Sequence, residues 1–238
     1  MSRAPVDARD RLIVALDVPS GAEARALVKE LGDTVSFYKV GLELFTGTDG
    51  FRMVDWLAGQ DKQIFVDLKF FDVPATVARA VRQLRGRQIT FATVHGNDAM
   101  MRAAAEASGE VGILAVTVLT SLDAADMQDL GFDCDIPDLV RSRAKRAVAL
   151  GCAGVVASGQ EATVLRQSLG DEGLIVTPGI RPGDHDDDQK RAVTPAQALH
   201  DGADYLVVGR PIRDAASPRD AARSIQAEIA SALAEARP

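Results

Sequence analysis

The chain has 238 residues, of which 47% are hydrophobic and 26% charged, and 27 basic against 34 acidic side chains give a net charge of −7. This is the composition of an ordinary globular protein with enough chain for a sizeable core, which excludes a disordered chain and a disulfide-stapled mini-protein. A pI near 5.0 with dispersed basic residues argues against nucleic-acid binding, which rests on clustered Lys and Arg.

Eight short β-branched runs recur along the chain, and their apolar character is nearly continuous rather than alternating. Strands buried on both faces of a parallel sheet have this pattern. The runs begin at Leu12, Val35, Gln63, Ile89, Val111, Ala153, Gly173 and Asp204.

Amphipathic stretches that predict helices lie between these runs. Ser20 with Glu23 three residues later fits a capping box, followed by an apolar helical face over 24–31. Similar faces occupy 73–84, 140–148 and 222–233. Repeated strand and helix units in a chain of this length favour an α/β fold, a closed (β/α)₈ TIM barrel. A doubly wound open sheet usually has fewer strands and a glycine fingerprint, and neither GxGxxG nor GxxxxGK[ST] is present.

No linker or low-complexity segment divides the chain. We therefore expect a single domain over 1–238, with the barrel core over about 11–213 and a C-terminal helix after it. Two connections are long for such a fold, 120–137, which contains a short predicted helix, and 177–194. Gly179 and Gly183 are candidate hinges in the second, whose DHDDD run reads most simply as a solvated face.

The two cysteines, Cys134 and Cys152, have no CxxC spacing, and we expect free thiols. The N-terminus has no apolar signal region. The longest nearly apolar run, 147–157, is shorter than the roughly 18 residues a membrane span needs. These features predict a cytoplasmic protein without membrane contact. His185 has no partner at metal-ligand spacing, and no metal site is expected there.

Polar residues concentrate where the predicted strands end. In a parallel barrel the active site lies at the carboxyl ends of the strands, so these positions carry the most functional weight. They are Asp17, Lys39, Asp67, Lys69, His95, Thr120, Gly209 and Arg210.

The densest cluster is VDLKFFDVPAT, residues 66–76. Asp67 and Lys69 are two residues apart, so both project to one face of an extended strand, and Asp72 follows in the turn. A carboxylate beside an ammonium keeps the lysine protonated, which suits a general acid that delivers a proton to carbon. The alternative is a plain ion pair with Asp72 as a helix N-cap, although Lys39 nearby favours a functional array.

Seven segments together resemble the orotidine 5′-phosphate decarboxylase family. They are IVALD (13–17), YKVGLELF (38–45), DLKFFDVPAT (67–76), VTVLTS (116–121), TPGIRP (177–182), DDQKR (187–191) and YLVVGRPI (205–212). The resemblance implies conversion of orotidine monophosphate to uridine monophosphate in pyrimidine synthesis, without a metal or organic cofactor.

The resemblance also implies residue roles. Lys69 would donate the proton to the pyrimidine carbon, within a charged array completed by Lys39, Asp67 and Asp72. In a homodimer with shared sites, Asp72 and Thr76 would reach the neighbouring subunit's site. The remaining contacts would be Asp17 and Lys39 to the ribose hydroxyls, Thr120 to the pyrimidine edge, and Arg181, Gln189, Gly209 and Arg210 to the phosphate.

Three places depart from the family pattern. Phe71 stands where the family commonly has histidine, Ala75 where it has asparagine, and GNDAM follows His95 in place of small residues and glycines. All charged groups remain, so we expect activity to survive. His95 is interpreted as a structural or rim residue, and His200 as a surface residue.

Two alternatives remain open. One is a metal-assisted sugar-phosphate decarboxylase on the same barrel, which would stabilise an enediolate. The other is a phosphate or nucleotide sensor without catalytic activity.

Overall fold

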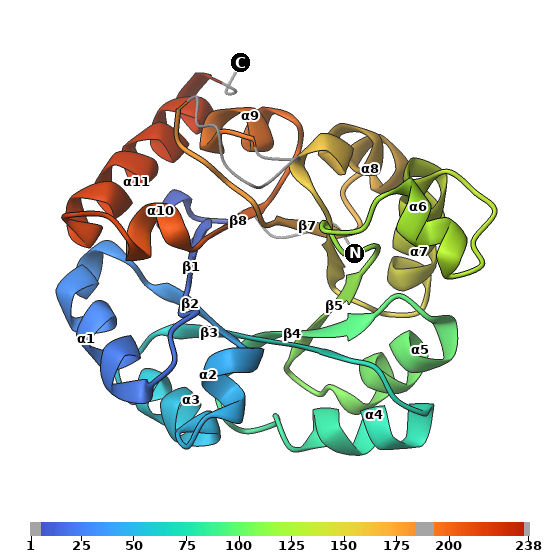
Figure 1. Ribbon diagram of the computed structural model, residues 1–238, viewed down its shortest axis with the longest axis horizontal. Helices are drawn as coiled ribbons and strands as arrows, with labels where there is room; N and C mark the ends of the chain where they lie inside the picture. The colour runs from blue at the N-terminus through green and yellow to red at the C-terminus, as the bar shows by residue number, and fades with distance from the viewer. Residues whose placement is uncertain (1–5, 184–192, 236–238) are drawn as a thin grey trace.

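The structure is a computed structural model that describes residues 6–183 and 193–235. Eight parallel strands form a closed barrel in chain order, with β8 paired to β1 (Figure 1). The predicted barrel is confirmed. The strands are β1 (Leu12–Ala15), β2 (Phe37–Gly41), β3 (Gln63–Phe70), β4 (Ile89–His95), β5 (Gly112–Val116), β6 (Gly154–Val156), β7 (Leu174–Thr177) and β8 (Tyr205–Val208).

Helices form the outer ring (Figure 1). Ser20 caps the first long helix by accepting a hydrogen bond from the Glu23 backbone, as the capping pattern predicts. The helices are α1 (Gly21–Leu31), α2 (Leu42–Thr46), α3 (Gly50–Ala58), α4 (Pro74–Arg82), α5 (Asp98–Ala107), α6 (Ala124–Asp129), α7 (Ile136–Ala149), α8 (Ala162–Leu169), α9 (Pro195–His200), α10 (Arg210–Arg213) and α11 (Pro218–Glu235), with 3₁₀ turns η1 (Ala8–Asp10), η2 (Gly32–Thr34) and η3 (Gly159–Glu161).

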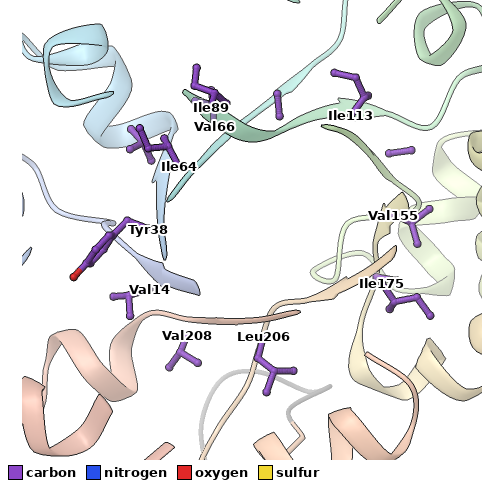
Figure 2. Close-up of a cluster of buried hydrophobic side chains, with 14 of the residues drawn as sticks. Val14, Tyr38, Ile64, Val66, Ile89, Ile113, Val155, Ile175, Leu206 and Val208 are labelled. Carbon is purple, nitrogen blue, oxygen red and sulfur yellow. The ribbon is translucent and has the colours of Figure 1, made fainter. Parts of the chain in front are cut away.

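Alternate residues of each strand serve two separate cores. Side chains such as Val14, Tyr38 and Ile64 point outward from the barrel and pack against the helices (Figure 2). Their neighbours along the strands point inward and form a second cluster that contains Phe37, Phe65, Phe91 and Tyr205. This division explains the nearly continuous apolar runs, because both faces of each strand are buried.

The aromatic rings fill the part of the barrel interior toward the amino-terminal ends of the strands. Phe37 stacks on Phe91 with 5.7 Å between ring centroids, and Tyr205 meets Phe91 edge-on at 5.2 Å. Two residues further along their strands, and therefore on the same inward side, Phe37 is followed by Lys39 and Phe65 by Asp67. The polar groups of the site thus stand on an apolar floor.

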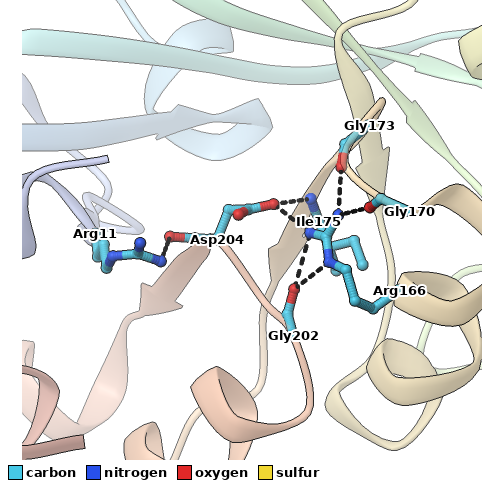
Figure 3. A network of polar contacts seen from close by, with 7 residues as sticks. All are labelled: Arg11, Arg166, Gly170, Gly173, Ile175, Gly202 and Asp204. Atoms are coloured by element: carbon cyan, nitrogen blue, oxygen red, sulfur yellow. Dashed lines mark hydrogen bonds and ion pairs between the residues drawn. The ribbon is translucent and has the colours of Figure 1, made fainter. Parts of the chain in front are cut away.

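A buried ion pair joins the amino-terminal ends of β7 and β8 (Figure 3). Asp204 Oδ2 accepts hydrogen bonds from Arg166 Nη2 at 2.6 Å and from the Ile175 backbone at 2.8 Å. Arg166 also donates to the carbonyl groups of Gly170, Gly173 and Gly202. This network fixes the end of the barrel opposite the polar strand ends.

The structure also bears on several smaller predictions. The helix within 120–137 is present as α6, Cys134 is exposed, Cys152 is buried, and both thiols are free. Within the described residues, no helix is long and apolar enough to cross a membrane.

One helical face was predicted wrongly at its first residue. Val73 is 64% exposed and precedes α4, because Pro74 starts the helix and the apolar face begins at Val77.

Candidate active site

A cavity of about 310 Å³ opens at the carboxyl ends of the strands. It brings together eight of the residues singled out from the sequence. They are Asp17, Lys39, Asp67, Lys69, Thr120, Arg181, Gly209 and Arg210, and apolar walls come from Phe65, Val116, Val156 and Val207.

Two ammonium groups share one carboxylate in this cavity. Asp67 Oδ2 lies 2.9 Å from Lys69 Nζ and 3.6 Å from Lys39 Nζ, and Lys39 also bonds Asp17 Oδ1 at 2.9 Å. The side chains of Lys39 and Asp67 are 10% and 12% exposed, whereas that of Lys69 is 31% exposed. Lys69 is therefore the ammonium of the pair that is more open to the cavity.

The backbone of Lys69 is not an extended strand, contrary to the sequence-based expectation. Its φ is 47°, in the left-handed region that non-glycine residues rarely adopt. The pairing of β3 with β4 shifts between Val66 and Phe70, so β3 carries a bulge here. The bulge redirects the lysine side chain, a recurrent use of such irregularities near active sites. Lys69 still meets Asp67, by a different backbone route.

Thr93 of β4 stabilises this bulge through two hydrogen bonds. Its hydroxyl accepts a hydrogen bond from the Lys69 backbone N–H at 2.9 Å and donates one to Asp67 Oδ1 at 2.9 Å. Thr93 is fully buried. Sequence analysis missed this residue, although its place two residues before His95 on the inward side of β4 was a usable signal.

The Asp67 carboxyl is held ionised. Burial alone would raise its pKa, but the Lys39 and Lys69 charges and the hydrogen bonds from Lys69 and Thr93 outweigh burial, so the pKa lies below its ordinary value of 3.8. At neutral pH the cluster therefore holds an anion between two cations. A further charge placed here would interact strongly with the cluster, because Lys39 and Asp67 are largely shielded from water.

Gly41 leaves room for this arrangement. A β-carbon at position 41 would lie 3.0 Å from both Asp17 Oδ1 and Lys39 Nζ, closer than ordinary contact. A side chain here would press on the ion pair between Asp17 and Lys39. The glycine is thus matched to its two charged neighbours.

The opposite side of the cavity is rich in arginine. Arg181 is buried after β7, and its backbone N–H bonds the Val193 carbonyl at 3.0 Å. Gly209 and Arg210 lie at the start of α10. Arg213, which the sequence analysis did not identify, also lines the cavity and donates to the Asp17 carbonyl at 2.6 Å. Loops after β7 and β8 with such groups suit a phosphate dianion.

Two predicted site residues, Asp72 and Thr76, do not line this cavity. Asp72 is exposed on the connection between β3 and α4, and its carboxylate accepts only a bond from the adjacent Val73 backbone at 2.6 Å among the contacts described. The N-cap position is taken by Val73, so the alternative interpretation of Asp72 as a helix N-cap is wrong. Thr76 lies in the first turn of α4 and accepts from Arg79. Gln189 and His185 fall outside the described residues.

His95 is half-buried at the end of β4. Its ring meets the exposed Phe71 ring edge-on at 4.9 Å between centroids. Burial first, and then the charges of Arg143 and Lys69, lower the pKa of His95 below 6.5, so the imidazole is neutral at pH 7. This agrees with a structural or rim position. His200 is exposed at the end of α9, as expected.

The arrangement has a specific chemical capacity. An ammonium in a cavity with apolar walls can stabilise negative charge that develops on a ligand atom and then transfer its proton to that atom. The arginine-lined side can hold a phosphate several ångströms away. Among the described residues, no three or more His, Cys, Asp or Glu side chains are grouped so as to hold a metal ion.

The chain is similar in sequence to proteins of one known family. Residues 10–225 match the model of the orotidine 5′-phosphate decarboxylase / HUMPS family. An orotidine 5′-phosphate decarboxylase of Methylococcus capsulatus is 61% identical over 231 residues, covering 96% of each chain. One of Stenotrophomonas maltophilia is 54% identical over 239 residues, covering 98% of this chain and 99% of the relative.

Solved structures are similar throughout the barrel. An orotidine 5′-phosphate decarboxylase from Lactobacillus acidophilus superposes with a TM-score of 0.83 at 34% identity, covering 92% of this chain and 99% of that one. The enzyme of the same name from Pyrococcus horikoshii gives a TM-score of 0.75 at 29% identity, with the same coverage.

Proposed function

The chain belongs to the orotidine 5′-phosphate decarboxylase / HUMPS family, its activity is the decarboxylation of orotidine 5′-phosphate to uridine 5′-phosphate, and we propose that Lys69 supplies the proton. One observation carries this proposal. The Lys69 ammonium lies 2.9 Å from a buried, ionised carboxylate at the mouth of a cavity whose far side is cationic.

The reaction requires a positively charged group beside the reacting carbon. When the bond to the carboxylate breaks, carbon dioxide leaves and the electron pair stays on the pyrimidine carbon. No ring carbonyl is placed to absorb that pair, so an adjacent ammonium must stabilise it. The Lys69 N–H proton then passes to the carbon, and the neutral amine recovers a proton from solvent.

Asp67 contributes to this step in two ways. Its negative charge lies beside the positive charge of Lys69, and the hydrogen bond between them orients the ammonium. Lys39 lies 3.6 Å from the same carboxylate oxygen, Oδ2, and with Asp17 it would meet the ribose hydroxyls. The pyrimidine edge would lie near Thr120, which also lines the cavity.

The substrate phosphate would bind at the arginine-rich side. Arg181, Arg210 and the Gly209 backbone lie there, and Gln189 is expected to join them. Enzymatic barrier reductions reach on the order of 20 kcal/mol, more than one lysine supplies. Binding energy from the remote phosphate therefore contributes to orienting the reacting carbon.

A homodimer with shared sites completes the proposal. Asp72 and Thr76 lie outside their own chain's cavity, and Asp72, Phe71 and Val73 are exposed together. A second copy that covers this segment would place Asp72 against the partner's Lys69. The cytoplasmic location remains a prediction.

Turnover in the presence of a chelator separates the proposed chemistry from a metal-assisted sugar-phosphate decarboxylase. Orotidine 5′-phosphate is incubated with the protein and excess EDTA, and the loss of pyrimidine absorbance is followed. Undiminished turnover supports the proposal, whereas turnover that requires added magnesium contradicts it. Tight binding of the nucleotide without product at high protein concentration would instead indicate a sensor.

A further inference from the structure

The backbone of Lys69 adopts an unusual conformation that must be stabilised by other residues. Lys69 has a φ of 47°, in the left-handed region that is unfavourable for a residue with a side chain, and such a conformation persists only where surrounding groups determine it. The β3 bulge also removes the regular ladder partners between Val66 and Phe70. Something outside β3 must therefore fix the lysine backbone.

Thr93 is the group that does so. Its single hydroxyl accepts a hydrogen bond from the Lys69 backbone N–H and donates one to Asp67 Oδ1, both at 2.9 Å. One oxygen therefore links the Lys69 backbone to the Asp67 carboxylate. The lysine ammonium bonds the other carboxylate oxygen, Oδ2. The result is a closed ring of contacts through three residues.

Thr93 has no direct access to a ligand. It is fully buried and does not line the cavity. Two residues on from Phe91, it stands on the aromatic floor. Any effect of its hydroxyl on the reaction must therefore pass through Lys69 and Asp67.

We propose that Thr93 is a positioning residue that sets the direction of the Lys69 ammonium by holding both the strained lysine backbone and the Asp67 carboxylate. This inference rests on the proposed function, because it assigns a purpose to the Lys69 geometry. Asp67 also depends on the hydroxyl for part of its hydrogen bonding, so loss of the hydroxyl alters both members of the pair.

Three substitutions at position 93 test the proposal. Thr93→Val keeps the β-branched shape and removes the hydroxyl, Thr93→Ser keeps the hydroxyl, and Thr93→Ala removes both should valine disturb folding. Thr117→Val is the matched control. Thr117 is an equally buried threonine whose hydroxyl bonds only the Val156 carbonyl at 3.2 Å among the contacts described.

The expected result is a split between kcat and KM. Thr93→Val should lower kcat about 10- to 100-fold, the effect of a lost hydrogen bond to a charged group, while KM changes far less. Thr93→Ser should restore most of kcat. The acid limb of the kcat profile should move to higher pH in Thr93→Val, because Asp67 loses a donor that favours its ionised form.

Three outcomes would overturn the inference. These are wild-type kcat in both Thr93→Val and Thr93→Ala, failure of Thr93→Ser to recover activity, or an equal loss in Thr117→Val. Lys69→Ala, measured in the same assays, distinguishes failure of the role proposed for Lys69 from failure of the role proposed for Thr93. Full activity in Lys69→Ala defeats the proton-donor role proposed for Lys69, while an inactive Lys69→Ala beside fully active Thr93→Val and Thr93→Ala defeats only the role of Thr93.

Discussion

Lys69 bonds Asp67 through its ammonium at 2.9 Å although its own backbone stands in the left-handed region, at a φ of 47°. On a regular strand, residues two apart such as Asp67 and Lys69 would project their side chains in parallel from the same face. The bulge instead turns the lysine back over the carboxylate and toward the cavity. The protein therefore accepts local strain where the charged pair is needed.

The buried network of Figure 3 should be a main source of stability. Asp204→Asn removes the buried carboxylate that pairs with Arg166 and accepts from the Ile175 backbone, and we expect a loss of about 3 kcal/mol in unfolding free energy. Denaturant titration measures it. Asp55→Asn, which breaks the more exposed pair with Arg87, is the control and should cost less than about 1 kcal/mol. Equal losses in the two variants would contradict this account.

The two thiols should differ in reactivity. Burial raises the pKa of Cys152 to about 12, whereas Cys134 is exposed. Ellman's reagent should therefore modify Cys134 in the folded protein and Cys152 only after unfolding. A Cys134→Ser variant that still reacts quickly when folded would show that Cys152 is accessible.

His95 should make stability depend on pH below neutrality. Its pKa is lowered in the folded protein, so the unfolded chain binds a proton first as pH falls through 6.5. The stability gained from the neutral imidazole is complete above that pH and is lost progressively below it.

His95→Phe keeps a ring against Phe71 and removes this titration. Between about pH 7.5 and about pH 5.5, the variant should lose less unfolding free energy than the wild type. An identical pH dependence in the two proteins would exclude His95 as its source.

Shared sites predict complementation between inactive chains. In a hybrid of Lys69→Ala and Asp72→Ala subunits, one site keeps Lys69 from one chain and Asp72 from the other. Mixing the two variants under conditions of subunit exchange should restore part of the activity, measured as loss of orotidine 5′-phosphate absorbance. No recovery despite proven exchange would place Asp72 outside the partner's site.

The sequence was sufficient for most of the architecture. Continuous apolar runs predicted buried parallel strands, and the carboxyl ends of those strands predicted one cavity, where Asp17, Lys39 and Asp67 do lie together. The rule works because every strand of a parallel barrel ends at the same rim.

Other features depend on contacts that no local pattern carries. The left-handed Lys69 arises from the pairing of β3 with β4, and Thr93 gains its role only because that pairing sets it beneath the bulge. Arg213 reaches the Asp17 carbonyl from the far end of the chain. Val73 was assigned to a helical face because its spacing fits, but Pro74 starts the helix after it.

The most direct test of the account is the single-turnover rate of carbon dioxide release by Lys69→Ala, with circular dichroism and thermal melting to establish that the variant is folded. We predict that the rate falls by several orders of magnitude, because the developing carbanion loses both its charge partner and its proton donor. Release at the wild-type rate by the folded variant would contradict the role assigned to Lys69.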